Sequence, residues 1–164
     1  AMPPVVSFVG KSNSGKTTVI EKILPLLKTR GLRIAVIKHA LHGFEIDRKG
    51  KDSFRHKAAG ADAVVVASPS CVAVVRDDSN AALDELLQYV SDMDLVFTEG
   101  FKRERYPKIE VLRAARGGPL LCADDPTLAA VVTDLDVSLK VPAFGLEQVE
   151  DLAGFVVERF LKGA

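Results

Sequence analysis

The chain has 164 residues, a length typical of one domain. Hydrophobic residues make up 48% of it, enough for a packed core, and 22 basic residues balance 22 acidic ones, which excludes a strong overall field for nucleic acid or an anionic membrane. No apolar run is long enough to span a membrane, and Cys71 and Cys122 lack the spacing of a metal or redox motif. We therefore expect one cytoplasmic domain over residues 1–164, with Ala1 a cloning remnant and both cysteines reduced and buried.

Short β-branched segments alternate with helical periodicity, which is typical of an α/β sheet. The pattern first predicts a buried strand at Val5–Val9, which ends at a glycine. It then predicts a helix with one apolar face over residues 19–27, in which Pro25 should cause a bend or an early end. A second strand is expected at Arg33–Lys38, followed by an irregular polar segment over residues 39–51.

The middle of the chain predicts a short helix from Asp52 or Ser53 to Gly60 and then two strands, Ala63–Ala67 and Cys71–Arg76. Only Ser-Pro-Ser separates these strands, so they should form a β-hairpin. The rest of the pattern predicts helices near residues 83–90 and 152–160 and strands at Leu95–Thr98, Lys108–Leu112 and Leu128–Thr133. The expected fold is α/β, a three-layer α/β/α arrangement with a mostly parallel sheet and a β-hairpin extension.

Residues 10–17 match the phosphate-binding pattern G-x-x-x-x-G-K-[ST] in full. A predicted strand precedes them and an amphipathic helix follows, which is the setting of this loop in a P-loop NTPase. Glycines let the backbone curl so that successive N–H groups and the helix N-terminus face one anion. Lys16 is expected to reach the β- and γ-phosphates, Thr17 to bind Mg²⁺ and Thr18 to contact the α-phosphate. The predicted nucleotide-binding residues of the loop are Gly10, Ser12, Asn13, Ser14, Gly15, Lys16, Thr17 and Thr18.

Mg²⁺ at such a loop also needs a carboxylate at the end of a neighbouring strand. Glu99 directly follows a predicted strand and precedes a glycine, so Thr17 and Glu99 form the predicted metal-binding pair. Asp94 precedes that strand and fits less well. Asp47 and Asp52, which follow the second strand, are alternatives for holding metal or positioning water, or are simply solvated charges.

The strand predicted at Leu128–Thr133 is followed by Asp134. A carboxylate can accept hydrogen bonds from N1–H and N2–H₂ of guanine together, a donor pair that adenine lacks. Asp134 is therefore a candidate guanine reader, although the full Asn-Lys-x-Asp signature of common GTPases is absent. An ordinary turn aspartate at the end of a strand is the alternative interpretation.

Basic residues are concentrated in two segments, residues 48–57 and 102–108, which both follow strands near the predicted nucleotide face. A site for a second anionic ligand and a merely solvated surface are both compatible with this enrichment. The spacing of His39, His42 and His56 is not that of a zinc motif, so phosphate contact or loop packing is the preferred interpretation of these histidines.

Four segments of the chain closely resemble the family of molybdopterin-guanine dinucleotide biosynthesis protein B (MobB). They are the P-loop, IKHALHGFEIDRKGKDSFRHKAAGADAVVVASP (residues 37–69), FTEGFKRERYPKIEV (residues 97–111) and AVVTD (residues 130–134). The resemblance covers essentially the whole chain in order. The family's loop usually reads Lys-His-x-His-His-Asp, whereas this chain has Leu41 and Gly43, which removes one imidazole and one carboxylate from that loop.

This resemblance implies a P-loop GTPase fold of the type found in nickel-insertion GTPases, a homodimer, and binding of GTP and Mg²⁺ with slow hydrolysis. It implies an accessory role beside the guanylyltransferase MobA, which joins GMP to molybdopterin, so GTP, molybdopterin and MobA are the expected partners. Residues 10–18 and Glu99 carry over as the site, with Lys16 and Glu99 acting in hydrolysis, and Asp134 as the contact to the base. Slow turnover agrees with a sequence that reveals no evident arginine finger or water-orienting glutamine.

Three other functions use the same loop. A GTPase metallochaperone would need a Cys/His cluster, for which Cys71 and Cys122 are poorly spaced. A small-molecule P-loop kinase would use the basic segments to hold its acceptor and would consume nucleotide quickly only when the acceptor is present. A nucleotide-sensing adaptor would bind GTP tightly without turnover.

Overall fold

The computed structural model describes residues 1–78 and 81–161 of the chain. The chain divides into two compact units, one made of residues 1–39 with the chain from Leu83 onward and the other of residues 40–82. The larger unit contains the phosphate-binding loop, and the smaller unit contains the predicted hairpin.

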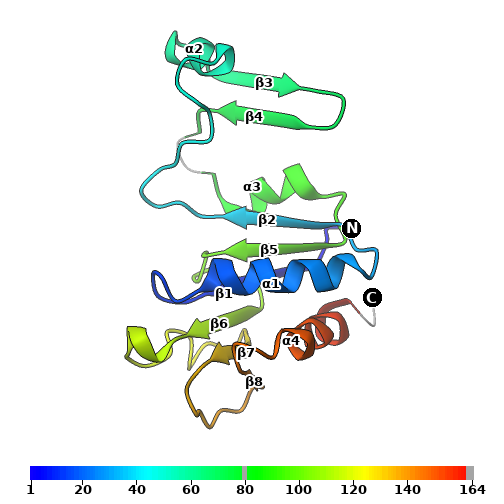
Figure 1. Ribbon diagram of the computed structural model, residues 1–164, viewed down its shortest axis with the longest axis vertical. Coiled ribbons are helices and arrows are strands. Elements are labelled where there is room, and N and C mark those ends of the chain that lie inside the picture. Colours follow the sequence, from blue (N-terminus) through cyan, green and yellow to red (C-terminus); the bar gives the residue numbers. More distant parts are fainter. Residues whose placement is uncertain (79–80, 162–164) are drawn as a thin grey trace. The chain divides into compact units, whose positions relative to one another are not determined.

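The larger unit is built on a six-stranded sheet in the order β2-β5-β1-β6-β7-β8, in which neighbouring strands are parallel. Strand β1 lies between β5 and β6, so the residues that follow β1 are flanked by the ends of both neighbours (Figure 1). The sequence did not predict β8, because a strand of two residues has no readable period. The strands are β1 (Val5–Val9), β2 (Ile34–Lys38), β5 (Leu95–Glu99), β6 (Lys108–Leu112), β7 (Leu128–Thr133) and β8 (Ala143–Phe144).

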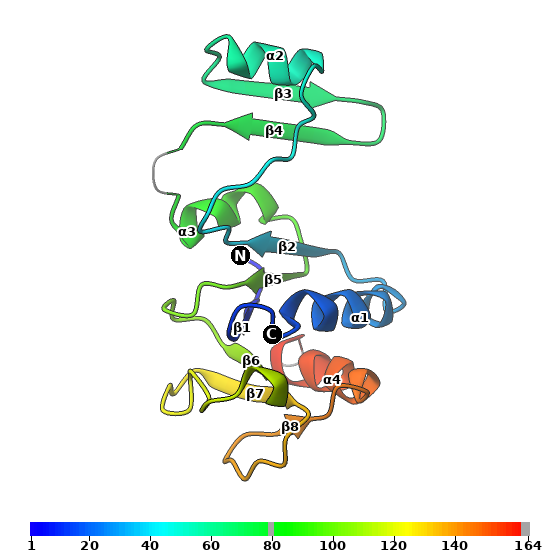
Figure 2. The same ribbon diagram turned by 60° about the vertical axis from the view of Figure 1, so that its left-hand side comes forward.

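Helices cover both faces of this sheet. Helices α1 (Lys16–Lys28) and α4 (Val149–Val156), the latter continued by the π-helical turn η3 (Val157–Leu161), pack side by side on one face (Figures 1 and 2). Helix α3 (Leu83–Leu86) and the 3-10 turn η1 (Leu87–Val90) pack on the other face. The expected three-layer α/β/α fold is confirmed. None of the helices in the described part of the chain has the length and apolar character that crossing a membrane requires.

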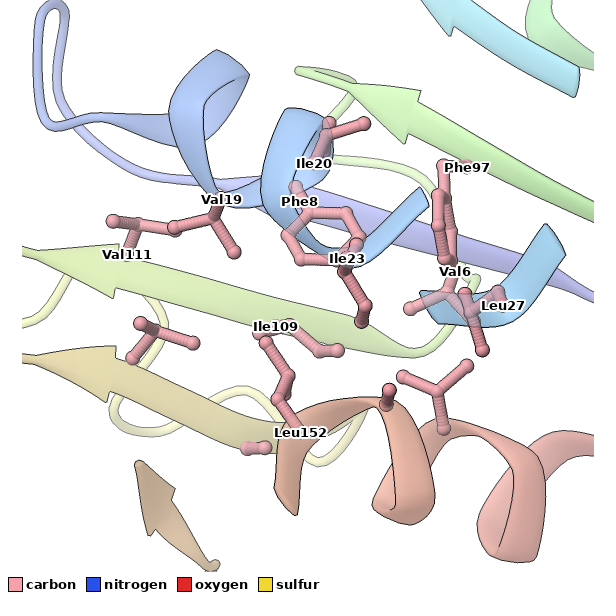
Figure 3. Packing of buried hydrophobic residues seen from close by; sticks show 14 of the residues in the cluster. Val6, Phe8, Val19, Ile20, Ile23, Leu27, Phe97, Ile109, Val111 and Leu152 are labelled. Carbon is pink, nitrogen blue, oxygen red and sulfur yellow. The ribbon is translucent and has the colours of Figure 1, made fainter. Parts of the chain in front are cut away.

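The main core lies between the sheet and the pair α1 and α4. Alternate residues of the strands point into it, and the rings of Phe8 and Phe97 meet edge to face at 5.0 Å between centroids (Figure 3). Helix α1 continues past Pro25 to Lys28, so this proline does not end the helix. The apolar side chains of α1 that face this core are Val19, Ile20, Ile23 and Leu27.

The smaller unit contains helix α2 (Asp52–Ala58) and the antiparallel strands β3 (Ala63–Ala67) and β4 (Val72–Arg76). The predicted hairpin is therefore confirmed. The expectation that both cysteines are buried is wrong for Cys71, which is exposed, whereas Cys122 is buried in the larger unit. Cys71 lies in the turn between the two strands, and turns of a small hairpin lie at the surface.

Candidate phosphate-binding site

The loop between β1 and α1 has a backbone that suits glycine at two positions. The φ angle is 151° at Gly10 and 98° at Gly15, in a region that residues with a Cβ atom rarely adopt. A methyl group on Gly10 would lie 2.5 Å from Val111 O and 2.8 Å from Ser14 Oγ. The start of the loop is thus packed against the end of β6 so closely that only glycine fits there.

The loop curls around the ammonium group of Lys16. Lys16 Nζ donates to Gly10 O at 2.9 Å and to Lys11 O at 3.3 Å, and Ser14 N donates to Lys11 O at 3.1 Å. Gly15 caps α1, and no side chain of the described residues caps the first turn, so its N–H groups remain open to an anion. Ser14 is buried, and its hydroxyl oxygen has no hydrogen-bond partner among the described residues.

The remaining predicted loop residues form the outer surface of this cradle. Ser12, Asn13, Thr17 and Thr18 are exposed along the loop and the first turn of α1. Asn13 adopts a φ angle of 60°, which is uncommon for a residue other than glycine and turns the chain at the tip of the loop. The predicted phosphate-contacting segment is therefore continuous and accessible.

Thr17 and Glu99 are brought together by the pairing of β1 with β5. Phe8 lies opposite Glu99 in this parallel register, so the end of β5 stands next to the start of the loop. Thr17 Oγ1 donates to Glu99 Oε1 at 2.5 Å, and Lys38 Nζ on the neighbouring strand β2 lies 3.9 Å from the same oxygen. The side chain of Glu99 is only 11% exposed, so its carboxylate is held at the edge of the loop.

The charges around the loop act on Lys16. Burial is the main cause that lowers the pKa of Lys16, and the Glu99 carboxylate opposes this effect. The positive charges of Lys38 and Lys102 lower the pKa further. The site therefore has a surplus of positive charge that an anion would relieve.

Asp134 follows β7 at the same edge of the sheet but is already engaged. Its Oδ1 atom accepts from Ala114 N at 2.7 Å, and its Oδ2 atom accepts from Arg113 Nε at 3.2 Å. The hydrogen bond from the Ala114 N–H is the main cause that lowers the pKa of Asp134, and Arg113 adds to it. The residue predicted to read guanine thus holds the start of the chain that follows β6.

Sequence reasoning missed this chain after β6, which includes the 3-10 turn η2 (Ala114–Arg116). Lys11 Nζ donates to Gly117 O at 2.6 Å, and Arg116 Nε donates to Asn13 O at 3.4 Å. The sequence signal was Arg113, a basic residue directly after the predicted strand Lys108–Leu112, but only the structure shows that this strand neighbours β1.

Other predicted candidates make different contacts in the larger unit or belong to the smaller unit. Asp94 accepts from Arg33 N at 2.7 Å at the opposite edge of the sheet, where β2 and β5 begin. Asp47 and Asp52 belong to the smaller unit. His39 follows β2, donates its N–H to Glu99 O at 3.0 Å and stacks on the ring of Phe101 at 4.8 Å between centroids.

The basic segment 102–108 does not form one open surface. Lys108 is buried at the start of β6, where its Nζ atom donates to Thr127 Oγ1 at 2.7 Å and lies 3.4 Å from Asp125 Oδ2. Arg105 pairs with Asp84 at 3.1 Å. Lys108 is therefore not available to an anion, because its charge is used inside the fold, whereas Arg105 is an exposed residue in a surface ion pair.

Comparison with known proteins places these features in one family. The family model for molybdopterin guanine dinucleotide synthesis protein B (MobB) matches residues 5–134. The chain is 37% identical to the molybdopterin-guanine dinucleotide biosynthesis adapter protein of Escherichia coli (strain K12), over 96% of this chain and 93% of that protein. It is 36% identical to the protein of the same description from Haemophilus influenzae, over 93% of this chain and 87% of that one.

Solved structures agree with these sequence relatives. A crystal structure of molybdopterin-guanine biosynthesis protein B (mobB) superposes with a TM-score of 0.78 at 34% identity, covering 96% of this chain and 99% of the other. The structure of Bacillus subtilis MobB has a TM-score of 0.76 at 30% identity and covers 98% and 99% of the two chains.

Proposed function

The chain belongs to the family of molybdopterin guanine dinucleotide synthesis protein B (MobB), and from this premise we propose that it is a GTP-binding adapter of molybdopterin-guanine dinucleotide biosynthesis with slow GTPase activity. The matched residues 5–134 include the phosphate-binding loop, Glu99 and Asp134. The observation that carries the proposal is the contact between Thr17 and Glu99 beside a loop whose N–H groups are open to phosphate.

The residues at this contact fit Mg²⁺. Thr17 offers a hydroxyl oxygen and Glu99 a carboxylate oxygen, and Mg²⁺ prefers hard oxygen ligands. When bound, Mg²⁺ neutralises charge on the β- and γ-phosphates. Thr17 and Glu99 would hold the metal through their side-chain oxygens; the hydrogen bond between them would then be given up, and the Thr17 hydroxyl would keep its proton.

Lys16 and Glu99 are the residues that act in hydrolysis. Lys16 Nζ now donates to two carbonyl oxygens of its own loop, and a triphosphate replaces these with β- and γ-phosphate oxygens in stronger, charge-assisted hydrogen bonds. The N–H groups from Ser12 to Lys16 wrap the phosphates, and Thr18 contacts the α-phosphate. Turnover is slow because positioning and charge neutralisation act without a group that orients water.

Guanine selection by Asp134 is part of the proposal. Its carboxylate stands at the end of β7, two strands from the loop, on the edge where parallel sheets bind their ligands. Its accepting oxygens match the two donors of guanine, and ATP offers no such pair.

The proposed partners are GTP, molybdopterin and the guanylyltransferase MobA, with the chain as a cytoplasmic homodimer. The curated relatives are described as adapter proteins, which supports a role beside another enzyme. Val65, Val72 and Val74 on the hairpin of the smaller unit are exposed, which is apolar surface that a second copy would cover. Val65→Glu with Val74→Glu should then shift the mass measured by light scattering from dimer to monomer.

Calorimetric titration tests the nucleotide site. Wild type should bind GTP more tightly with Mg²⁺ than without it and more tightly than ATP. Glu99→Gln should remove the Mg²⁺ effect, whereas Glu21→Gln, an exposed carboxylate on α1, should keep it. Equal GTP affinity with and without Mg²⁺ in wild type would refute the metal pair, and equal affinity for ATP and GTP would refute guanine selection.

The adapter role has its own test. Adding the chain with GTP to MobA and molybdopterin should increase formation of the guanine dinucleotide, and Lys16→Ala should not support this increase. An unchanged yield with wild type would refute the accessory role while leaving nucleotide binding intact.

A further inference from the structure

Arg113 directly follows β6 and belongs to none of the motifs described above. Strands β1, β6 and β7 are neighbours and run parallel, so the phosphate-binding loop, Arg113 and Asp134 follow three adjacent strand ends at one edge. In open parallel sheets this edge is where ligands bind. An arginine between a phosphate loop and a carboxylate is therefore in the position of a ligand-contacting side chain.

The chain over residues 113–118, here called the arginine segment, is fastened to the loop at several points. A methyl group on Gly15 would lie 3.5 Å from Arg113 Nη1. Arg116 donates to Asn13 O, and Lys11 donates to Gly117 O at 2.6 Å. The Arg113 guanidinium is thus held close to Gly15, the residue that caps α1, and within reach of a phosphate bound by the loop.

Different nitrogen atoms of the Arg113 guanidinium face Asp134 and the phosphate-binding loop. Its Nε atom donates to Asp134 Oδ2 at 3.2 Å, while its Nη1 atom is the one that lies toward Gly15. The side chains of Arg113 and Asp134 are 38% and 31% exposed, so neither is locked in the core and both can change partner. Phosphate is a stronger competitor than one carboxylate oxygen, because guanidinium binds it through two parallel hydrogen bonds.

Resting on the proposed function, we infer that Arg113 is a nucleotide-phosphate ligand that exchanges Asp134 for the phosphate chain when nucleotide binds. Asp134 is its positioning residue in the free protein. The exchange releases Oδ2 of Asp134 for one donor of guanine, and Oδ1 accepts from the other donor through its second lone pair. Ala114 N keeps its hydrogen bond to Oδ1, so the carboxylate stays in place during the exchange. Base selection and phosphate binding are thereby coupled through one ion pair.

Tripolyphosphate with Mg²⁺ tests this exchange without any contribution from a base. Titration calorimetry of the full chain should show that Arg113→Ala weakens tripolyphosphate binding by about tenfold or more, the effect of one charge-assisted hydrogen bond. Asp134→Asn should strengthen binding several-fold, because the competing carboxylate charge is gone. In the double variant, Asp134→Asn should add nothing to Arg113→Ala.

The direction of the Asp134→Asn effect separates this inference from a structural role. If Asp134 only supports the arginine segment, its loss weakens tripolyphosphate binding, and that result would overturn the exchange. Unchanged binding in Arg113→Ala would overturn it as well. Circular dichroism of each variant verifies the fold, and Arg113→Lys should recover part of the affinity because it restores the charge.

A matched pair at the opposite edge of the sheet provides the control. Arg33 Nη2 lies 2.9 Å from Asp92 Oδ2, and Arg33→Ala and Asp92→Asn should leave tripolyphosphate binding unchanged. Lys16→Ala reports on the phosphate-binding loop itself. Wild-type affinity in Lys16→Ala would refute both proposals, whereas a loss in Lys16→Ala with none in Arg113→Ala would refute only this one.

Discussion

Replacement of Glu110 tests how the chain between β6 and β7 is held in place. This residue is 1% exposed, and its carboxylate oxygens accept hydrogen bonds of 2.7 Å from the N–H groups of Leu121 and Cys122. Glu110→Ala removes both acceptors; the Cys122 N–H is buried and the Leu121 N–H is partly buried, and a buried donor left unpaired costs about 1–3 kcal/mol. The free energy of unfolding should therefore fall by about 2–4 kcal/mol, a large share of the stability of a typical domain.

Urea denaturation followed by circular dichroism measures this loss by linear extrapolation. Glu110→Gln retains one accepting oxygen but turns an amide N–H toward a backbone donor, so it should cost about 1–3 kcal/mol and keeps the test usable if the alanine variant does not fold. Glu21→Ala, an exposed change on α1, should stay within about 0.5 kcal/mol of wild type. A Glu110→Ala loss no larger than this control would refute the reasoning.

Three further predictions concern other parts of the larger unit. Gly10→Ala should abolish GTP binding in calorimetry and cost about 1–3 kcal/mol of stability, because its methyl group would lie 2.5 Å from Val111 O; wild-type affinity would contradict this. Lys108→Met should lower the urea midpoint through loss of about 1–3 kcal/mol, because it removes buried hydrogen bonds, and an unchanged midpoint would show that they contribute nothing. The Ala114 N–H lowers the pKa of Asp134 in the folded protein. The stability that this carboxylate contributes is therefore present above the ordinary aspartate pKa of about 3.9, and it is lost as the pH falls through the lower pKa of the folded protein. The stability difference between wild type and Asp134→Asn should therefore shrink in urea denaturation below about pH 4, and a difference that is constant with pH would exclude this linkage.

The sequence by itself determined the parts of this protein whose signal is local. The strand before Gly10, the pattern of residues 10–17 and the apolar face of α1 predicted a phosphate-binding loop in its strand–helix setting, and the structure has those elements there. Glu99 was also accessible to sequence reasoning, because a carboxylate directly after a buried strand must lie at the carboxyl edge of a parallel sheet. A short apolar run, a motif of fixed spacing and the helical period of 3.6 residues were sufficient for these predictions.

The tertiary structure alone decided which charges meet. Asp134 is 21 residues from Arg113, and Lys11 is 106 residues from Gly117, so only the strand order β1-β6-β7 brings these partners together. The same order buries Lys108 at the start of β6. Cys71 is exposed beside the separate two-stranded sheet of the smaller unit. The spacing of hydrophobic residues indicates which face of a strand is buried, but it does not show which strand lies next to it in the sheet. The pairing of polar groups at the edge of the sheet depends on that neighbouring strand.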